Sequence, residues 1–124
     1  MSRTRPIPPA KSPRDPEMAR LIRRVAVLTV AYVSARRATP DLKKAAAKLK
    51  VDVDAWRGRT GRRDFRAVMT KRKKPNGIPG WTCESCQWIM VSLGRICFLV
   101  GCDPEWNQCS YICFTMPKDD FPVG

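Results

Sequence analysis

All six cysteines of this chain lie after Trp81, and thiols so closely spaced can bind a metal ion or pair with one another. A C-x2-C pair can hold one zinc ion from a tight turn, because two thiolates two residues apart reach the same metal. The chain contains no histidine, so structural zinc would need four cysteines, or cysteines together with a carboxylate. We therefore predict zinc as the cofactor, with the ligands Cys83, Cys86, Cys97 and Cys102.

The same cysteines suit a second interpretation, because their number is even and apolar residues separate them. Three disulfides would then hold a compact core, although the sequence cannot choose among the many possible pairings. Disulfides would require an oxidising compartment and would predict a secreted protein, whereas zinc would fit a protein of the cytoplasm or nucleus. Unpaired core thiols are a third interpretation, and the sequence leaves all three open.

Positive charge is concentrated in the other part of the chain. Residues 1–82 hold 22 Lys and Arg against 6 Asp and Glu, whereas residues 83–124 hold 2 against 5. The net charge of +13 predicts a polyanionic partner, which could be nucleic acid, an anionic membrane or an acidic protein. No apolar run approaches the roughly 20 residues that a membrane-spanning helix needs. Without histidine or an obvious pair of catalytic carboxylates, we predict that the protein is not an enzyme.

Composition divides the chain into four predicted segments. Residues 1–16 form a basic, proline-rich tail that we expect to be disordered, and residues 17–70 form a basic helical domain. Residues 71–82 form a charged linker, and residues 83–124 form the cysteine-rich module. The predicted fold class is therefore small and mainly α, with a basic helical N-terminal part joined to a small cysteine-stapled module.

Capping signals place the helices of the basic domain. Asp15-Pro16-Glu17 and Thr39-Pro40-Asp41 each combine a capping residue with proline at the first helical position. We expect Gly58 and Gly61 to break the second of these helices. A further basic helix is predicted from Arg62 to Thr70.

Residues 46–57 resemble the helix-turn-helix pattern. Ala46 and Leu49 would lie on its first helix, Lys50 in the turn and Val51 in the buried corner. An ordinary helical hairpin with a basic surface is the alternative. In either case arginines and lysines nearby can contact phosphates without reading a base sequence. The predicted phosphate-contacting residues are Arg57, Arg59, Arg62, Arg63, Arg66, Lys71, Arg72, Lys73 and Lys74.

A basic helical part, an arginine-rich run and a four-cysteine finger together resemble the small cysteine-rich nucleic-acid-binding proteins of carlavirus-type plant viruses. The arginine-rich run corresponds to Gly58-Arg59-Thr60 and Arg62-Arg63, and the finger to the four cysteines predicted as zinc ligands. This resemblance implies binding of RNA and DNA, zinc, and suppression of host silencing or defence. The predicted function is accordingly nucleic-acid binding by a basic helical arm and a zinc-finger-like module.

The cysteine-rich part alone is also similar to halocin-type peptides, which carry a C-x2-C pair and a later Gly-Cys, as Gly101-Cys102 provides here. Such peptides are secreted, are processed from longer precursors and act on competitor cells. The alternative function is thus a secreted, disulfide-rich antimicrobial or toxin-like peptide released from a cationic precursor. A third hypothesis is an accessory subunit of a large ribonucleoprotein or membrane complex.

Overall fold

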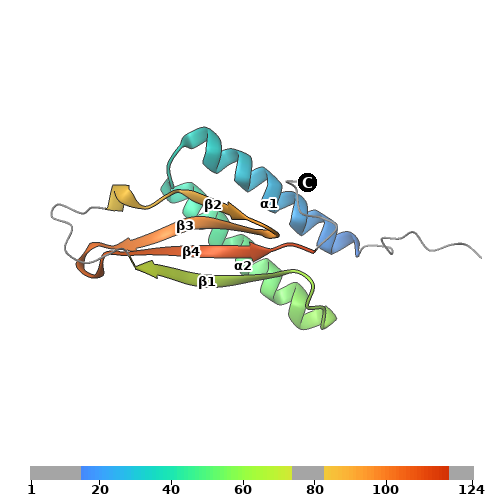
Figure 1. The fold of residues 1–124 in the computed structure, drawn as a ribbon. Coiled ribbons are helices and arrows are strands. Elements are labelled where there is room, and N and C mark those ends of the chain that lie inside the picture. Colours follow the sequence, from blue (N-terminus) through green and yellow to red (C-terminus); the bar gives the residue numbers. More distant parts are fainter. Residues whose placement is uncertain (1–14, 74–82, 118–124) are drawn as a thin grey trace, which may run out of the picture.

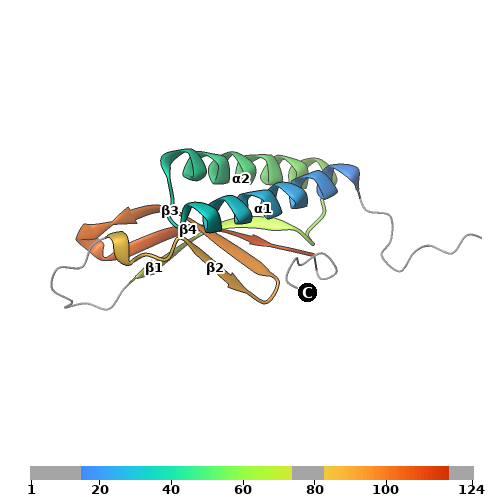
Figure 2. The ribbon, with the colours of Figure 1, turned by 90° about the horizontal axis from the view of Figure 1, so that it is seen from above.

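A computed structural model describes residues 15–73 and 83–117. Both helices lie on one face of a four-stranded antiparallel sheet and form a layer above it (Figure 1; Figure 2). The fold is therefore mixed α/β, and the prediction of a mainly α protein was wrong. The elements in chain order are α1 (Pro16–Ala35), α2 (Pro40–Thr60), β1 (Arg66–Lys73), the short 3-10 helix η1 (Cys83–Ser85), β2 (Ile89–Ser92), β3 (Arg95–Asp103), η2 (Pro104–Trp106) and β4 (Gln108–Thr115).

Helix α1 begins where the capping signal predicted. The Asp15 side chain accepts a hydrogen bond from the backbone N–H of Glu17, and Pro16 occupies the first turn. The helix ends at Arg36, whose backbone is left-handed with φ of 58° and whose N–H bonds to the carbonyl of Tyr32. Both ends are thus set by local hydrogen bonds, which explains why the sequence pattern located the start correctly.

Helix α2 begins at the predicted Thr39 cap but runs without interruption to Thr60, so the predicted helix-turn-helix is wrong. Its buried stripe of Ala46, Leu49, Val53 and Trp56 continues at helical spacing through the expected turn. Ion pairs of Lys48 with Asp52 and of Lys50 with Asp54 follow the same spacing and support the helix there. Gly58 lies within the helix, and only Gly61, with φ of 72°, ends it.

The segment expected to form a third basic helix instead supplies the edge strand β1. The strand order is β1-β4-β3-β2, and β1 pairs with β4 along its whole length, with Ala67 opposite Phe114. Phe65 and Ala67 are buried beneath the helices, while most of β1 is exposed. The strand therefore depends on a partner 35 to 49 residues away along the chain, which a local pattern cannot reveal.

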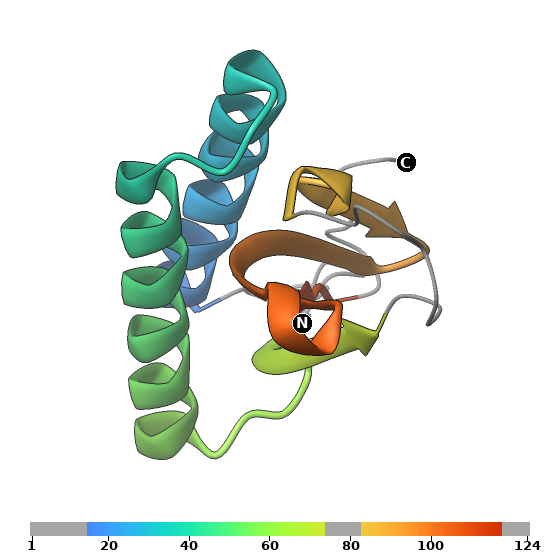
Figure 3. The same ribbon diagram turned by 90° about the vertical axis from the view of Figure 1, so that its left-hand side faces the viewer.

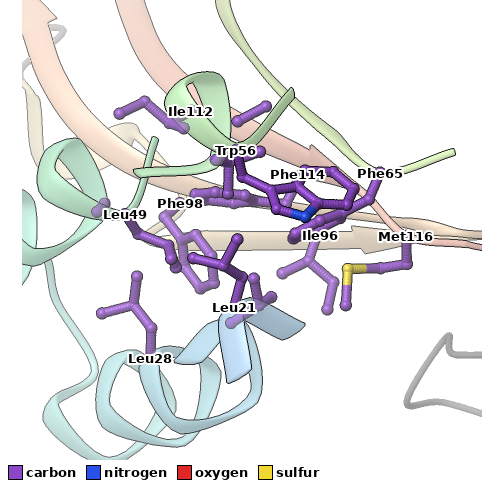
Figure 4. Close-up of a cluster of buried hydrophobic side chains, with 14 of the residues drawn as sticks. Leu21, Leu28, Leu49, Trp56, Phe65, Ile96, Phe98, Ile112, Phe114 and Met116 are labelled. Carbon is purple, nitrogen blue, oxygen red and sulfur yellow. The ribbon is translucent and has the colours of Figure 1, made fainter. Parts of the chain in front are cut away.

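One hydrophobic core joins the helices to the cysteine-bearing strands (Figure 4). Phe98 of β3 lies 4.9 Å from the ring of Tyr32 on α1 and 5.7 Å from that of Phe114 on β4, between ring centroids. On α2, Trp56 packs against Phe65 at 5.7 Å. The basic and cysteine-rich parts of the sequence thus bury their apolar side chains against each other.

Tyr32 connects the helical layer to the sheet and should make the protein less stable at alkaline pH. It is buried and donates a hydrogen bond to the Leu99 carbonyl oxygen at 2.8 Å. Burial raises its pKa far above the ordinary 10.0, so the unfolded chain ionises before the folded protein does. The contribution of Tyr32 to the free energy of unfolding should therefore be constant below about pH 9 and fall as the pH rises above about 10, which urea titrations at about pH 9 and pH 11 would measure as a loss of stability.

The Tyr32→Phe variant provides the control for this prediction. Phenylalanine cannot ionise, so the variant should lose less of its stability between the two pH values than the parent. Burial also raises the pKa of Tyr111, so part of the loss should persist in the variant. An identical pH dependence in parent and variant would show that Tyr32 does not contribute.

Candidate functional site

The six cysteines form three disulfides, so the predicted zinc finger and metal-binding function were wrong. The pairs are Cys83–Cys102, Cys86–Cys109 and Cys97–Cys113. The four predicted zinc ligands belong to three different disulfides and do not converge on one point. Within residues 15–73 and 83–117, no group of three or more Cys, Asp or Glu is arranged to hold a metal ion. The alternative interpretation of the cysteines, disulfide bonding, is the one that the structure supports.

The disulfides build a second, smaller core on the face of the sheet that the helices leave open. It contains Leu99 and Tyr111 together with four buried cysteines, and Met90 packs against it. Cys97 and Cys113 lie directly opposite each other on neighbouring strands. By the loop-closure argument, each crosslink stabilises the fold by about 3 kcal/mol for sequence separations of 16 to 23 residues.

The predicted phosphate-contacting residues that the structure describes are distributed over the end of α2, the loop that follows it and β1. Arg59 and Arg62 are already paired with carboxylates, those of Glu17 and Asp64 respectively. The Asp64 carboxylate hydrogen-bonds to Arg62 and so raises the pKa of the guanidinium. Arg57 lies at the end of α2, Arg63 in the loop that follows, and Arg66, Lys71, Arg72 and Lys73 on β1. Lys74 lies outside the described residues.

The outward side of the two helices carries an exposed apolar stripe that the sequence analysis did not identify. On α1, Val27, Val30 and Val33 are 63%, 65% and 53% exposed, and on α2 Val51 is 61% exposed. The three valines of α1 recur every three residues, so Val30 lies beside both Val27 and Val33, while Val27 and Val33 are about 120° apart around the helix. That spacing is visible in the sequence. We call these four valines, together with the cations Arg23, Arg24 and Lys48, the outer helix face.

A groove of about 490 Å³ runs between α1 and α2 on this side. Figure 3 shows the two helices side by side on the left, next to the sheet. The lining of this groove combines apolar with cationic side chains. The apolar residues are Val27, Leu28, Ala31, Leu42, Ala45 and Leu49, and the cations are Arg23, Arg24 and Lys48. A surface with apolar and cationic groups interleaved suits a partner that offers both hydrocarbon and negative charge.

The outer helix face keeps a net positive charge despite one carboxylate beside it. Asp52 accepts from Lys48 at 2.9 Å and from Arg24 at 2.8 Å. Hydrogen bonds from Lys48 first and from Arg24 second lower the pKa of Asp52, so it remains ionised at neutral pH. One carboxylate thus faces two cations, and Arg23 adds a third charge that is exposed and has no ion pair among the described residues.

Comparisons with family models, curated proteins and solved structures find no match to this chain. The similarities to carlavirus-type proteins and to halocin-type peptides therefore remain predictions. Among the described helices, none is long and apolar enough to cross a bilayer.

Proposed function

We propose that this protein acts in an oxidising compartment as a secreted, cationic, disulfide-stabilised protein of the antimicrobial or toxin-like class. It binds anionic membranes through the outer helix face, with the helices lying in the headgroup region. The observation that carries this proposal is the set of exposed valines on α1, of which Val27 lines the inter-helix groove together with Arg23, Arg24 and Lys48. The three disulfides support the proposal of an oxidising compartment, because such bonds persist where thiols are oxidised.

The proposed active form is the whole fold rather than a cysteine-rich peptide released from its precursor. The inner face of the cysteine-bearing strands, including Ile96, Phe98 and Phe114, is buried under α1 and α2. Separating the helices would expose that apolar face to water. The helices are therefore both part of the core and the proposed membrane-contacting element.

Charge and apolar burial should contribute comparably to binding. Each lysine or arginine near an anionic bilayer contributes about 1 kcal/mol, and fully burying a valine contributes roughly 1.5 kcal/mol or more. The three cations of the outer helix face together then contribute a few kcal/mol to binding. Its four half-exposed valines together contribute a similar amount. Binding should consequently need anionic lipid and weaken as salt increases.

Vesicle co-sedimentation tests the proposal with the oxidised full chain. We expect binding to vesicles of phosphatidylglycerol and phosphatidylcholine, and at least tenfold weaker binding to phosphatidylcholine alone. The Val27→Asp/Val30→Asp variant should bind the anionic vesicles at least tenfold more weakly, because it places two negative charges on the contacting face.

Leu93→Asp is the matched control, because Leu93 is an apolar residue that is 95% exposed in the turn between β2 and β3. This variant should bind like the parent protein. Equal loss in both variants would show that general charge, and not the outer helix face, governs binding. Failure of the parent protein to bind anionic vesicles would refute the proposed function.

A further inference from the structure

The sheet curls so that its two edge strands approach each other on the open face. Arg72 of β1 lies with its Nη1 atom 3.5 Å from the Sδ atom of Met90 on β2, although β4 and β3 separate these strands in the sheet. The open face is therefore concave. It contains a groove of about 310 Å³, lined by Thr70, Arg72, Gln87, Ile89, Met90, Val91, Ser92, Arg95, Cys97 and Cys113.

The lining of the groove within the described residues is positively charged. Arg72 and Arg95 both belong to it, and no Asp or Glu of residues 15–73 and 83–117 does. Within the same residues, the two arginines contact neutral acceptors: the Met90 sulfur for Arg72, and the Thr70 hydroxyl oxygen at 3.3 Å from Arg95 Nη2. A guanidinium has five N–H donors, so most donors of both arginines are left for a ligand. In contrast, Arg24, Arg59 and Arg62 elsewhere in the described residues are paired with acids.

The walls of the groove are covalently and locally braced. The disulfide Cys97–Cys113 joins the two central strands beneath the arginines. Tyr111, on the same face, donates to the backbone oxygen of Gln87 at 2.9 Å and so ties the segment before β2 to β4. A braced site loses little freedom when it binds, which favours affinity for a small ligand.

We propose that this groove binds a phosphate or sulfate monoester. Two guanidinium groups can donate paired hydrogen bonds to the oxygens of a tetrahedral anion, which offers more acceptors than a carboxylate does. The Thr70 and Ser92 hydroxyls lie in the same lining and supply further donors. Figure 2 shows both helices on one side of the sheet. The groove includes Cys97 and Cys113 of the core on the other face, so this site goes beyond the proposed function.

The test titrates the oxidised full chain with glycerol 3-phosphate and follows the arginine Nε–H signals by NMR. We expect saturable binding that shifts the Arg72 and Arg95 signals. Arg72→Gln/Arg95→Gln should weaken binding at least tenfold. Arg72→Lys/Arg95→Lys should also weaken it, because lysine keeps the charge but loses the paired donors. Absence of saturable binding to any monoester would overturn the proposal.

Arg63→Gln is the matched control, because Arg63 is an exposed arginine in the loop before β1 and does not line the groove. It should bind glycerol 3-phosphate like the parent, and an equal loss in this variant would overturn the proposal. The signal shifts of the parent protein provide the same test if the double variants do not fold.

Vesicles of phosphatidic acid distinguish a lipid headgroup from a soluble monoester as the source. The vesicles are mixed with the Val27→Asp/Val30→Asp variant, in which the outer helix face should no longer bind membranes. Any binding that remains then reports on the groove. Binding of glycerol 3-phosphate supports the groove with a soluble source. Binding of these vesicles alone, lost on changing Arg72 and Arg95 to Gln, supports it with a lipid source. If the outer helix face does not bind membranes, the glycerol 3-phosphate titration and the phosphatidic acid binding assay still report on the groove.

Discussion

Reduction of the three disulfides should unfold this protein. The loops that they close span 16, 19 and 23 residues, and each contributes about 3 kcal/mol in the loop-closure model. Because the loops overlap, the contributions do not simply add, yet their total is comparable with the roughly 5–15 kcal/mol that stabilises a typical domain. The open-face core also consists largely of the bonded cysteines themselves. Near-UV circular dichroism with and without dithiothreitol would measure the loss of tertiary packing.

Thiol counting and a chelator separate this prediction from the zinc hypothesis. The native oxidised protein should show no free thiols, and the reduced protein should show six. The chelator EDTA should leave the oxidised protein unchanged, because disulfides and not a metal hold its cysteines. A reduced protein that kept its near-UV spectrum would contradict the prediction.

The Phe98→Ala substitution should lower the free energy of unfolding by about 3–5 kcal/mol, the usual cost of emptying a buried phenylalanine site. Phe98 is fully buried at the centre of the main core. It contacts Tyr32 from the helical layer and Phe114 from the sheet, so neither layer can fill the cavity alone. Urea denaturation followed by tryptophan fluorescence would measure the change, and a single transition should persist.

Leu93→Ala is the control for this prediction, because Leu93 is almost fully exposed. It should change the free energy of unfolding by less than about 0.5 kcal/mol. If Phe98→Ala cost under about 1 kcal/mol, or if the helices and the sheet unfolded in separate transitions, the shared core would be contradicted. The two parts would then behave as independent units.

Helix starts were predictable from the sequence because their causes are local. Asp15 and Thr39 cap their helices through side-chain bonds to backbone groups two and three residues away. The outer helix face could also have been found, since the valines of α1 repeat every three residues. Its exposure, however, depends on which side of the helix packs against the sheet, and spacing alone does not decide that.

The edge strand β1 and the continuous course of α2 were not predictable by local reasoning. The basic residues of β1 carry no strand pattern that distinguishes them from a helix, and their pairing with β4 decides the outcome. Lys50 and Val51 fit the helix-turn-helix pattern. However, packing of the buried stripe from Ala46 to Trp56 against the core stabilises an unbroken helix. In both places packing partners far along the chain overrode the local preference.

The sequence by itself determined the net charge, the helix caps and the even number of cysteines, because each is a property of single residues or of close neighbours. Only the tertiary structure decided that the cysteines pair as disulfides, that the basic and cysteine-rich parts share one core, and that Arg72 and Arg95 line one groove without an acid from the described residues. The physical reason is that cysteine pairing, burial and the convergence of charges depend on distances between strands. Those distances are set when the sheet forms and curls beneath the two helices.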